Sequence, residues 1–239
     1  MSISDINWAI VGIGLSGALI LLVRDWRITC SALLASYIFV ALFLTQQQFI
    51  TPDLRISGVG VSTTVLVKLI TGFAATAILA ITALTFSREY NLEDLDEFSL
   101  AELRRAARRA QRQSAAEPFR PGDYIVPFWA LVLATLASLA LPRLYPIGTN
   151  EVDFAWYWLG LTGLFTLVTA SDTLKIGLGL MLCAASVDLL YTAIASTVQV
   201  FPLALLSLMT IVLALAVAYL SGLLYGRLKT LELNELYKR

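Results

Sequence analysis

Residues 201–226 read FPLALLSLMTIVLALAVAYLSGLLYG and contain no charged side chain. A helix needs roughly 20 consecutive apolar residues to cross a hydrocarbon core about 30 Å thick, so this stretch is long enough to span a membrane. Other stretches of the chain have the same character. The seven predicted spans are 7–24, 28–46, 62–87, 124–144, 153–170, 174–197 and 201–227. The sequence therefore predicts an all-α polytopic membrane protein with seven transmembrane helices.

The composition of the whole chain supports this class and excludes several kinds of chemistry. Of the 239 residues, 58% are hydrophobic and 14% are charged, whereas soluble domains average roughly 45–50% apolar and ~25% charged residues. The absence of histidine excludes His-ligated haem, histidine zinc sites and a Ser-His-Asp triad. Two cysteines are too few for an iron–sulfur cluster, and 17 basic residues balance 17 acidic ones. We therefore expect no cofactor, no metal site and no nucleic-acid partner.

The basic residues are distributed unevenly between the two sides of the predicted spans, and cytoplasmic loops carry the excess of Lys and Arg in membrane proteins. If the loop after the first span is cytoplasmic, Arg55 and Arg143 lie outside and Lys68 lies within a span. The others then lie inside: Arg24, Arg27, Arg88, Arg104, Arg105, Arg108, Arg109, Arg112, Arg120, Lys175, Arg227, Lys229, Lys238 and Arg239. This predicts an outer N-terminus and a cytoplasmic C-terminus. No basic residue precedes the first span, so we expect a mature helix there and no signal peptide.

The spans form a pattern of three helices, one helix and three helices. Gly14-Leu15-Ser16-Gly17 in the first span aligns with Gly160-Leu161-Thr162-Gly163 in the fifth, and the loop at 24–27 then aligns with the loop at 170–173. Both units start outside, so we predict two parallel repeats, with the fourth span returning the chain to the outer side. The predicted units are 1–90 as the first repeat, 91–122 as a cytoplasmic loop, 123–150 as a linker helix and 151–239 as the second repeat with its tail.

The cytoplasmic loop is predicted to contain a basic amphipathic helix. Ser99 and Glu102 are spaced as a capping box, which predicts a helix from that point to about residue 113. The arginines of this helix are Arg104, Arg105, Arg108, Arg109 and Arg112. Three roles fit them equally: a solvated surface, a face held against anionic lipid headgroups at ~1 kcal/mol for each near-surface Arg, or a docking face for an acidic partner subunit.

Two ionisable residues lie within the predicted spans. Asp188 is near the middle of span 174–197, where an aspartate costs roughly 2.5–3.5 kcal/mol on insertion scales. It is either a protonatable site on an ion path or a hydrogen-bonded residue that holds helices together. Lys68 lies about 9 Å below the outer boundary and Asp188 about 15 Å below it. Lys68 can therefore snorkel to the interface, or it can pair with Asp188 if the two helices are neighbours.

Several stretches resemble a known family of membrane subunits. VRDWRITCS at 23–31 and TVLVKLI at 64–70 resemble the first hairpin and the lysine-bearing third helix of hydrogenase-4 component E. LKIGLGL at 174–180 and PLALLSLMTIV at 202–212 resemble the K-type subunit of NADH:quinone oxidoreductase and the C subunit of Mrp-type antiporters. The tail TLELNEL at 230–236 is also similar to the short tail of this family.

The resemblance covers nearly the whole chain except for residues 88–122, and it implies a function. The chain would be a non-catalytic integral subunit of a complex I-related, hydrogenase-type or Mrp-like complex in the bacterial inner membrane. Its partners would be membrane lipids and antiporter-like subunits, and it would contribute to proton or cation translocation or to the scaffold. Relatives carry a glutamate where this chain has Ala184, whereas Asp188 lies four residues further along the same helix face.

Two other functions compete with this one. A SWEET-like facilitative transporter of small solutes has the same three-one-three arrangement and the same orientation. Such transporters carry prolines within the helices of each repeat, whereas the first, second, third, fifth and sixth spans here contain none. A purely structural membrane scaffold is the third function, and it differs from an ion-path subunit in whether Asp188 affects ion flux. A retinal protein is excluded because residues 201–226 contain no lysine for a Schiff base.

Overall fold

The computed structural model describes residues 7–46, 54–56, 59–89, 122–170, 172–195 and 200–228. Helices dominate this part of the chain, as predicted. They are α1 (Trp8–Leu22), α2 (Trp26–Gln46), α3 (Thr63–Glu89), α5 (Gly122–Leu144), α6 (Asn150–Val168), α7 (Thr173–Ile194) and α8 (Val200–Leu228). A short antiparallel hairpin of β1 (Leu54–Ile56) and β2 (Val59–Val61) precedes α3, with Arg55 opposite Gly60. The prediction of an all-α protein is confirmed, and each predicted span corresponds to one helix.

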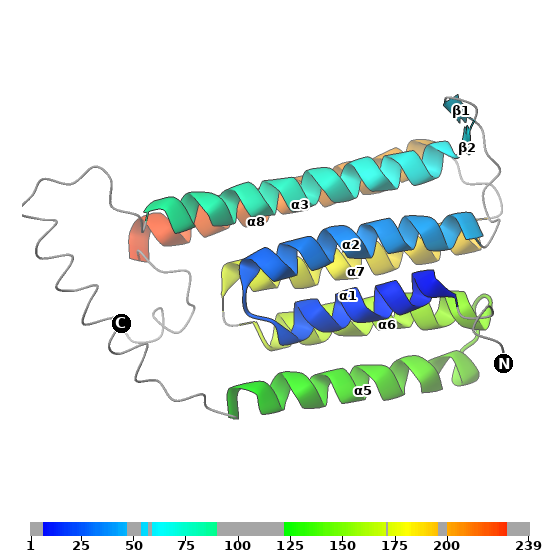
Figure 1. Cartoon of the computed structure of the whole chain (residues 1–239), viewed down its shortest axis with the longest axis horizontal. Helices are drawn as coiled ribbons and strands as arrows, with labels where there is room; N and C mark the ends of the chain where they lie inside the picture. The colour runs from blue at the N-terminus through cyan, green and yellow to red at the C-terminus, as the bar shows by residue number, and fades with distance from the viewer. Residues whose placement is uncertain are drawn as a thin grey trace, which may run out of the picture.

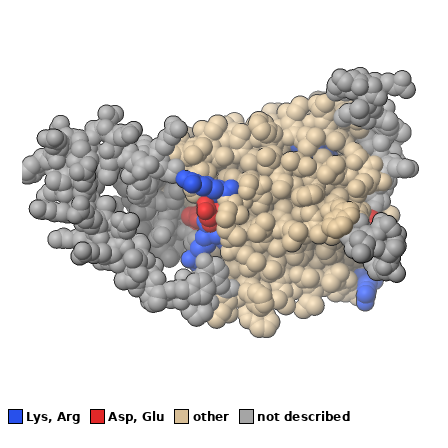
Figure 2. Space-filling view, viewed as in Figure 1, with Lys and Arg blue, Asp and Glu red and all other residues tan. Residues whose placement is uncertain are grey.

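Length and apolar composition identify the helices that can cross a membrane. In the described residues five qualify, over Trp26–Gln46, Thr63–Thr85, Ile125–Leu144, Thr173–Ile194 and Phe201–Leu224. The apolar helix α1 is shorter, with 15 residues, and α6 carries two carboxylates in its first turn. Figure 2 shows charged side chains mainly near the two ends of the described body, with a wide uncharged band between them. These features indicate a membrane-embedded protein.

The helices form two layers of three (Figure 1). The first layer contains α1, α2 and α3, and the second contains α6, α7 and α8. Helix α1 packs on α6, α2 on α7 and α3 on α8, and the helices of each pair run in the same direction. Helix α5 lies beside α6 and also contacts α1. The helix order is thus the same in both layers, so each helix faces the one at the corresponding place in the other.

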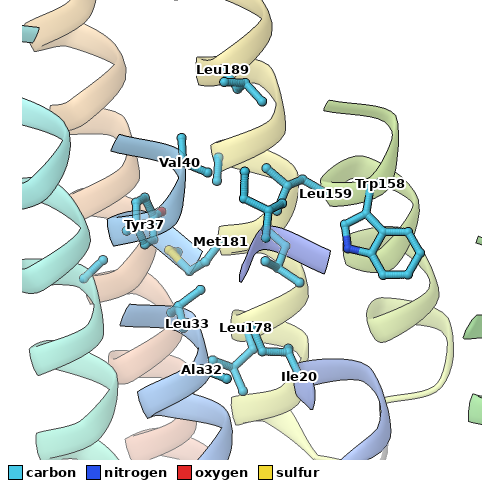
Figure 3. Packing of buried hydrophobic residues seen from close by; sticks show 14 of the residues in the cluster. Ile20, Ala32, Leu33, Tyr37, Val40, Trp158, Leu159, Leu178, Met181 and Leu189 are labelled. Carbon is cyan, nitrogen blue, oxygen red and sulfur yellow. The ribbon is translucent and has the colours of Figure 1, made fainter. Parts of the chain in front are cut away.

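Small residues let several of these helices approach closely. A Cβ added to Gly163 of α6 would lie 2.9 Å from the Gly179 carbonyl oxygen of α7, and a Cβ added to Gly179 would lie 2.9 Å from the Gly163 oxygen. A Cβ on Gly17 of α1 would lie 2.8 Å from the indole nitrogen of Trp158 in α6. Close packing of this kind stabilises helix pairs in lipid, where the hydrophobic effect contributes little to the association of helices. Figure 3 shows the larger side chains of this core, from α1, α2, α6 and α7.

The loops that lead into α2 and α7 end in the same way. Asp25 Oδ1 accepts a hydrogen bond from the backbone N–H of Arg27 at 2.9 Å, and Asp172 Oδ1 accepts one from the N–H of Lys175 at 2.6 Å. Each carboxylate therefore satisfies an N–H of the first turn that has no partner within its helix. Both loops lie at the same end of the bundle (Figure 1). The two loops therefore occupy equivalent places in the two layers, as α1 and α6 do, and as α2 and α7 do.

Candidate functional site

Lys68 of α3 and Asp188 of α7 form an ion pair between the two layers. Lys68 Nζ contacts Asp188 Oδ2 and also donates to the backbone oxygen of Asp188 at 3.3 Å. The Lys68 side chain is 2% exposed and the Asp188 side chain is 20% exposed. The sequence alone allowed either a snorkelling lysine or a pair, and the structure brings the two side chains together.

Asp188 lies nearer to the end of its helix than the sequence predicted. The apolar pattern continues to residue 197, which placed Asp188 near the middle of a helix. Helix α7 instead ends at Ile194, because Ala195 is extended, with φ −69° and ψ 108°. Asp188 is thus six residues from the end of α7, about 9 Å along the axis, and Lys68 is five residues from the start of α3, about 8 Å. Both residues lie at similar depth below the same end of the bundle, which is why they can meet.

Further polar groups surround the pair. The Thr192 hydroxyl donates to the Asp188 backbone oxygen at 2.7 Å, so this carbonyl accepts from two side chains. Tyr37 of α2 is buried against α3, where a Cβ on Gly72 would lie 2.4 Å from the tyrosine ring. Its hydroxyl is close enough to Asp188 for electrostatic interaction. Among the described residues, this hydroxyl and Asp188 Oδ1 are buried polar atoms without a hydrogen-bond partner.

A cavity of about 300 Å³ lies between α7 and α8, and Asp188 is one of its lining residues. Its lining is mainly apolar and consists of Leu180, Cys183, Ala184, Val187, Asp188, Leu206, Met209, Thr210 and Leu213. Ala184 and Asp188 therefore face the same space, as their spacing of four residues on one helix predicts. Asp188 thus contacts the buried lysine and also lines this partly open apolar cavity.

Two buried charged residues were not singled out by the sequence. Asp153 of α6 is 0% exposed and accepts hydrogen bonds from the backbone N–H groups of Ile147 and Gly148, both at 3.0 Å. It closes the loop between α5 and α6, so its role is structural. Lys175 was counted among the basic residues on the cytoplasmic side but is only 5% exposed, and its Nζ donates to the Leu21 carbonyl at 3.1 Å. A lysine just inside an apolar run was the signal that could have drawn attention to it.

The remaining predicted site residues cannot be placed in the same way. Arg104, Arg105, Arg108, Arg109 and Arg112, and the loop at 91–122 that carries them, lie outside the described residues apart from residue 122. Within the described part of the chain, no group of three or more His, Cys, Asp or Glu side chains is arranged to hold a metal ion. The site that the structure describes is therefore the Lys68–Asp188 pair with Tyr37 and Thr192 around it.

A scan against protein-family models, a search of curated proteins and a search of solved structures each found no match to this chain. The resemblance to hydrogenase-4 component E and its relatives therefore stays a prediction from the residues quoted above. The function has to be argued from the site itself.

Proposed function

We propose that this protein is a non-catalytic membrane subunit of a complex I-related, hydrogenase-type or Mrp-like ion-translocating complex, and that Lys68 and Asp188 lie on its ion path. The observation that supports the proposal is the buried ion pair between α3 and α7. Ionisable residues inside membrane helices are costly, and they commonly mark proton relays and ion pathways. A well-packed apolar pair at this place would often be as stable or more stable, so stability alone does not explain the two charges.

The pair can exist in two states, one with Asp188 charged and one with Asp188 protonated. In the charged state, Asp188 Oδ2 holds the Lys68 ammonium. A proton that binds to Asp188 Oδ1 neutralises the carboxylate and weakens its attraction for the lysine. Loss of that proton restores the ion pair. The Tyr37 hydroxyl is a further donor in the neighbourhood of this carboxylate, and it has no hydrogen-bond partner among the described residues.

We infer that α1–α3 and α6–α8 are two parallel repeats joined by α5, with seven helices crossing a bacterial inner membrane. The same helix order in both layers and the matching caps at Asp25 and Asp172 support this arrangement. The end that carries Arg24, Arg27 and Lys175 would face the cytoplasm under the positive-inside rule. In cells, a cysteine introduced at Gly148 is expected to react with an impermeant reagent from outside, whereas one at Arg27 is expected to be protected. The reverse labelling would contradict this orientation.

The outer faces of the bundle leave room for partner subunits. In the apolar part of α8 only 17% of the residues are buried within the chain, and in that of α5 only 28%. Lipid tails or helices of antiporter-like subunits would cover these faces. The proposed function favours partner helices on at least one of these faces.

Ion flux in vesicles tests the proposal. The complex that contains the full chain is reconstituted with the wild-type protein, Asp188→Asn or Lys68→Met. Each variant is expected to lower proton or sodium flux at least tenfold, because each removes one charge of the pair. Glu151→Gln changes an exposed carboxylate at the same end and is expected to leave flux unchanged. Full flux in Asp188→Asn would contradict the ion path and favour the function of a structural scaffold. Solute uptake that is independent of Asp188 would instead support the SWEET-like alternative.

A further inference from the structure

A second cavity lies at the opposite end of the bundle from the ion pair, where α2 and α7 begin. Its volume is about 220 Å³. The residues that matter for its chemistry are Arg24, Trp26, Asp172, Leu174, Lys175 and Leu178. It therefore combines basic side chains with an apolar wall, which distinguishes it from the cavity beside Asp188.

Lys175 is the buried cation of this cavity. It is 5% exposed, and its ammonium group has three N–H donors. The Leu21 carbonyl at the end of α1 accepts one of them. Asp172 points its Oδ1 at the backbone N–H of Lys175, 2.6 Å away, and among the described residues no carboxylate oxygen lies within 4.0 Å of the Lys175 ammonium. The ammonium of Lys175 thus donates to a neutral carbonyl, has the Asp172 carboxylate in its neighbourhood and lines the cavity.

Lys175 shares the cavity with one further basic residue and one acidic residue. Arg24 and Asp172 both line the cavity and are close enough to Lys175 to act on it electrostatically, Asp172 by attraction and Arg24 by repulsion. The starts of α2 and α7 contribute the positive ends of two helix dipoles, whereas the end of α1, which carries the Leu21 carbonyl, contributes a negative one. Among the residues that line the cavity, Arg24 and Lys175 outnumber Asp172. Figure 2 shows basic and acidic side chains close together at one end of the described body.

We propose that this cavity binds the phosphate group of an anionic membrane lipid. Arg24 and Lys175 contact the phosphate, and the glycerol and upper acyl chain lie along the apolar wall that Leu174 and Leu178 form. The site lies at the edge of the membrane-spanning body, since Lys175 is the third residue of α7. Trp26 is also suited to this place, because tryptophan favours the level of the lipid headgroups. The apolar lining favours a lipid over free phosphate. This proposal does not depend on the ion path.

Native mass spectrometry of the full chain in mild detergent tests the site. The protein is offered equal amounts of phosphatidylglycerol and phosphatidylethanolamine, and the retained lipids are counted. We expect the wild type to retain phosphatidylglycerol preferentially. Arg24→Gln and Lys175→Gln should each weaken this retention about fivefold, since a cation near the membrane surface contributes ~1 kcal/mol. Arg143→Gln at the opposite end is the matched control and should bind like the wild type.

Each outcome has a definite meaning. Equal retention of both lipids by the wild type would overturn the proposal, and so would an equal loss of retention in the Arg143 control. Arg24 is exposed, so Arg24→Gln carries the test if Lys175→Gln fails to fold. Competition by an excess of inorganic phosphate would show that the site takes the free ion and not a lipid. Asp188→Asn is expected to retain phosphatidylglycerol normally, so failure of the ion path would not affect the result.

Discussion

Breaking the Lys68–Asp188 pair from one side should destabilise the bundle far more than removing both charges. Removing one partner of a buried pair costs roughly 3–5 kcal/mol, because the other charge is left uncompensated. Asp188→Leu leaves the Lys68 charge, which is only 2% exposed, without its partner, so the destabilisation should lie at the upper end of this range. Asp188 is 20% exposed and lines a cavity, so Lys68→Met should lie at the lower end, about 3 kcal/mol.

The matched comparison is a variant that loses both charges. The double variant Lys68→Met/Asp188→Leu has no charge to bury and should lie within about 1.5 kcal/mol of the wild type.

Thermal melting of the full chain in mild detergent measures these differences. At roughly 2–4 °C per kcal/mol for a chain of this size, a loss of 3 kcal/mol lowers Tm by about 6–12 °C. Each single variant should show such a drop, and the double variant should recover most of it, which is the signature of direct coupling. Additive losses in the double variant would refute the reasoning, because they would mean that each residue acts independently of the other.

Two further predictions concern packing and loop closure. Gly163→Ala should push α6 and α7 apart, since its Cβ would lie 2.9 Å from the Gly179 oxygen; overpacking costs typically 1–3 kcal/mol, and a lower Tm is expected. Gly14→Ala is the matched control, because nothing lies within 4 Å of its added Cβ; an equal drop in both variants would contradict the prediction. Asp153→Ala should lower the free energy of unfolding by about 1.5–3 kcal/mol, because two loop N–H groups lose their charged acceptor. The control Glu151→Ala, in the same turn, should melt at a clearly higher temperature than Asp153→Ala.

Continuous apolar runs made the helices predictable, whereas their ends depended on local contacts. Helix α8, predicted as 201–227, spans Val200–Leu228, because no charged residue interrupts the run before Arg227. Helix α6 begins at Asn150 and not at Asp153, because Thr149 caps it and Asp153 is satisfied by the preceding loop. A carboxylate at the edge of an apolar run looks like a boundary in the sequence, but here it lies inside the first turn.

The site was predictable only in part, because its members come from distant segments. Lys68 and Asp188 could be selected as charges within apolar runs, but they are 120 residues apart, and only the stacking of the two layers brings them together. Tyr37 gave no signal, since a tyrosine in an apolar helix is common. Lys175 was counted only among the basic residues of the inner side, because its contact depends on where α1 ends, and sequence patterns do not fix that contact.

The separation of the paired charges has a consequence for how the protein is made. At about 5–20 residues per second, the ribosome needs roughly 6–24 seconds to extend the chain from Lys68 to Asp188. During that interval α3 carries a lysine without its carboxylate, so its first turns are expected to remain near the headgroups, where the ammonium can stay hydrated. Helix α3 can settle to its final depth only after α7 has entered the membrane. Assembly of this bundle is therefore completed late, and the second half of the chain sets the final position of the first.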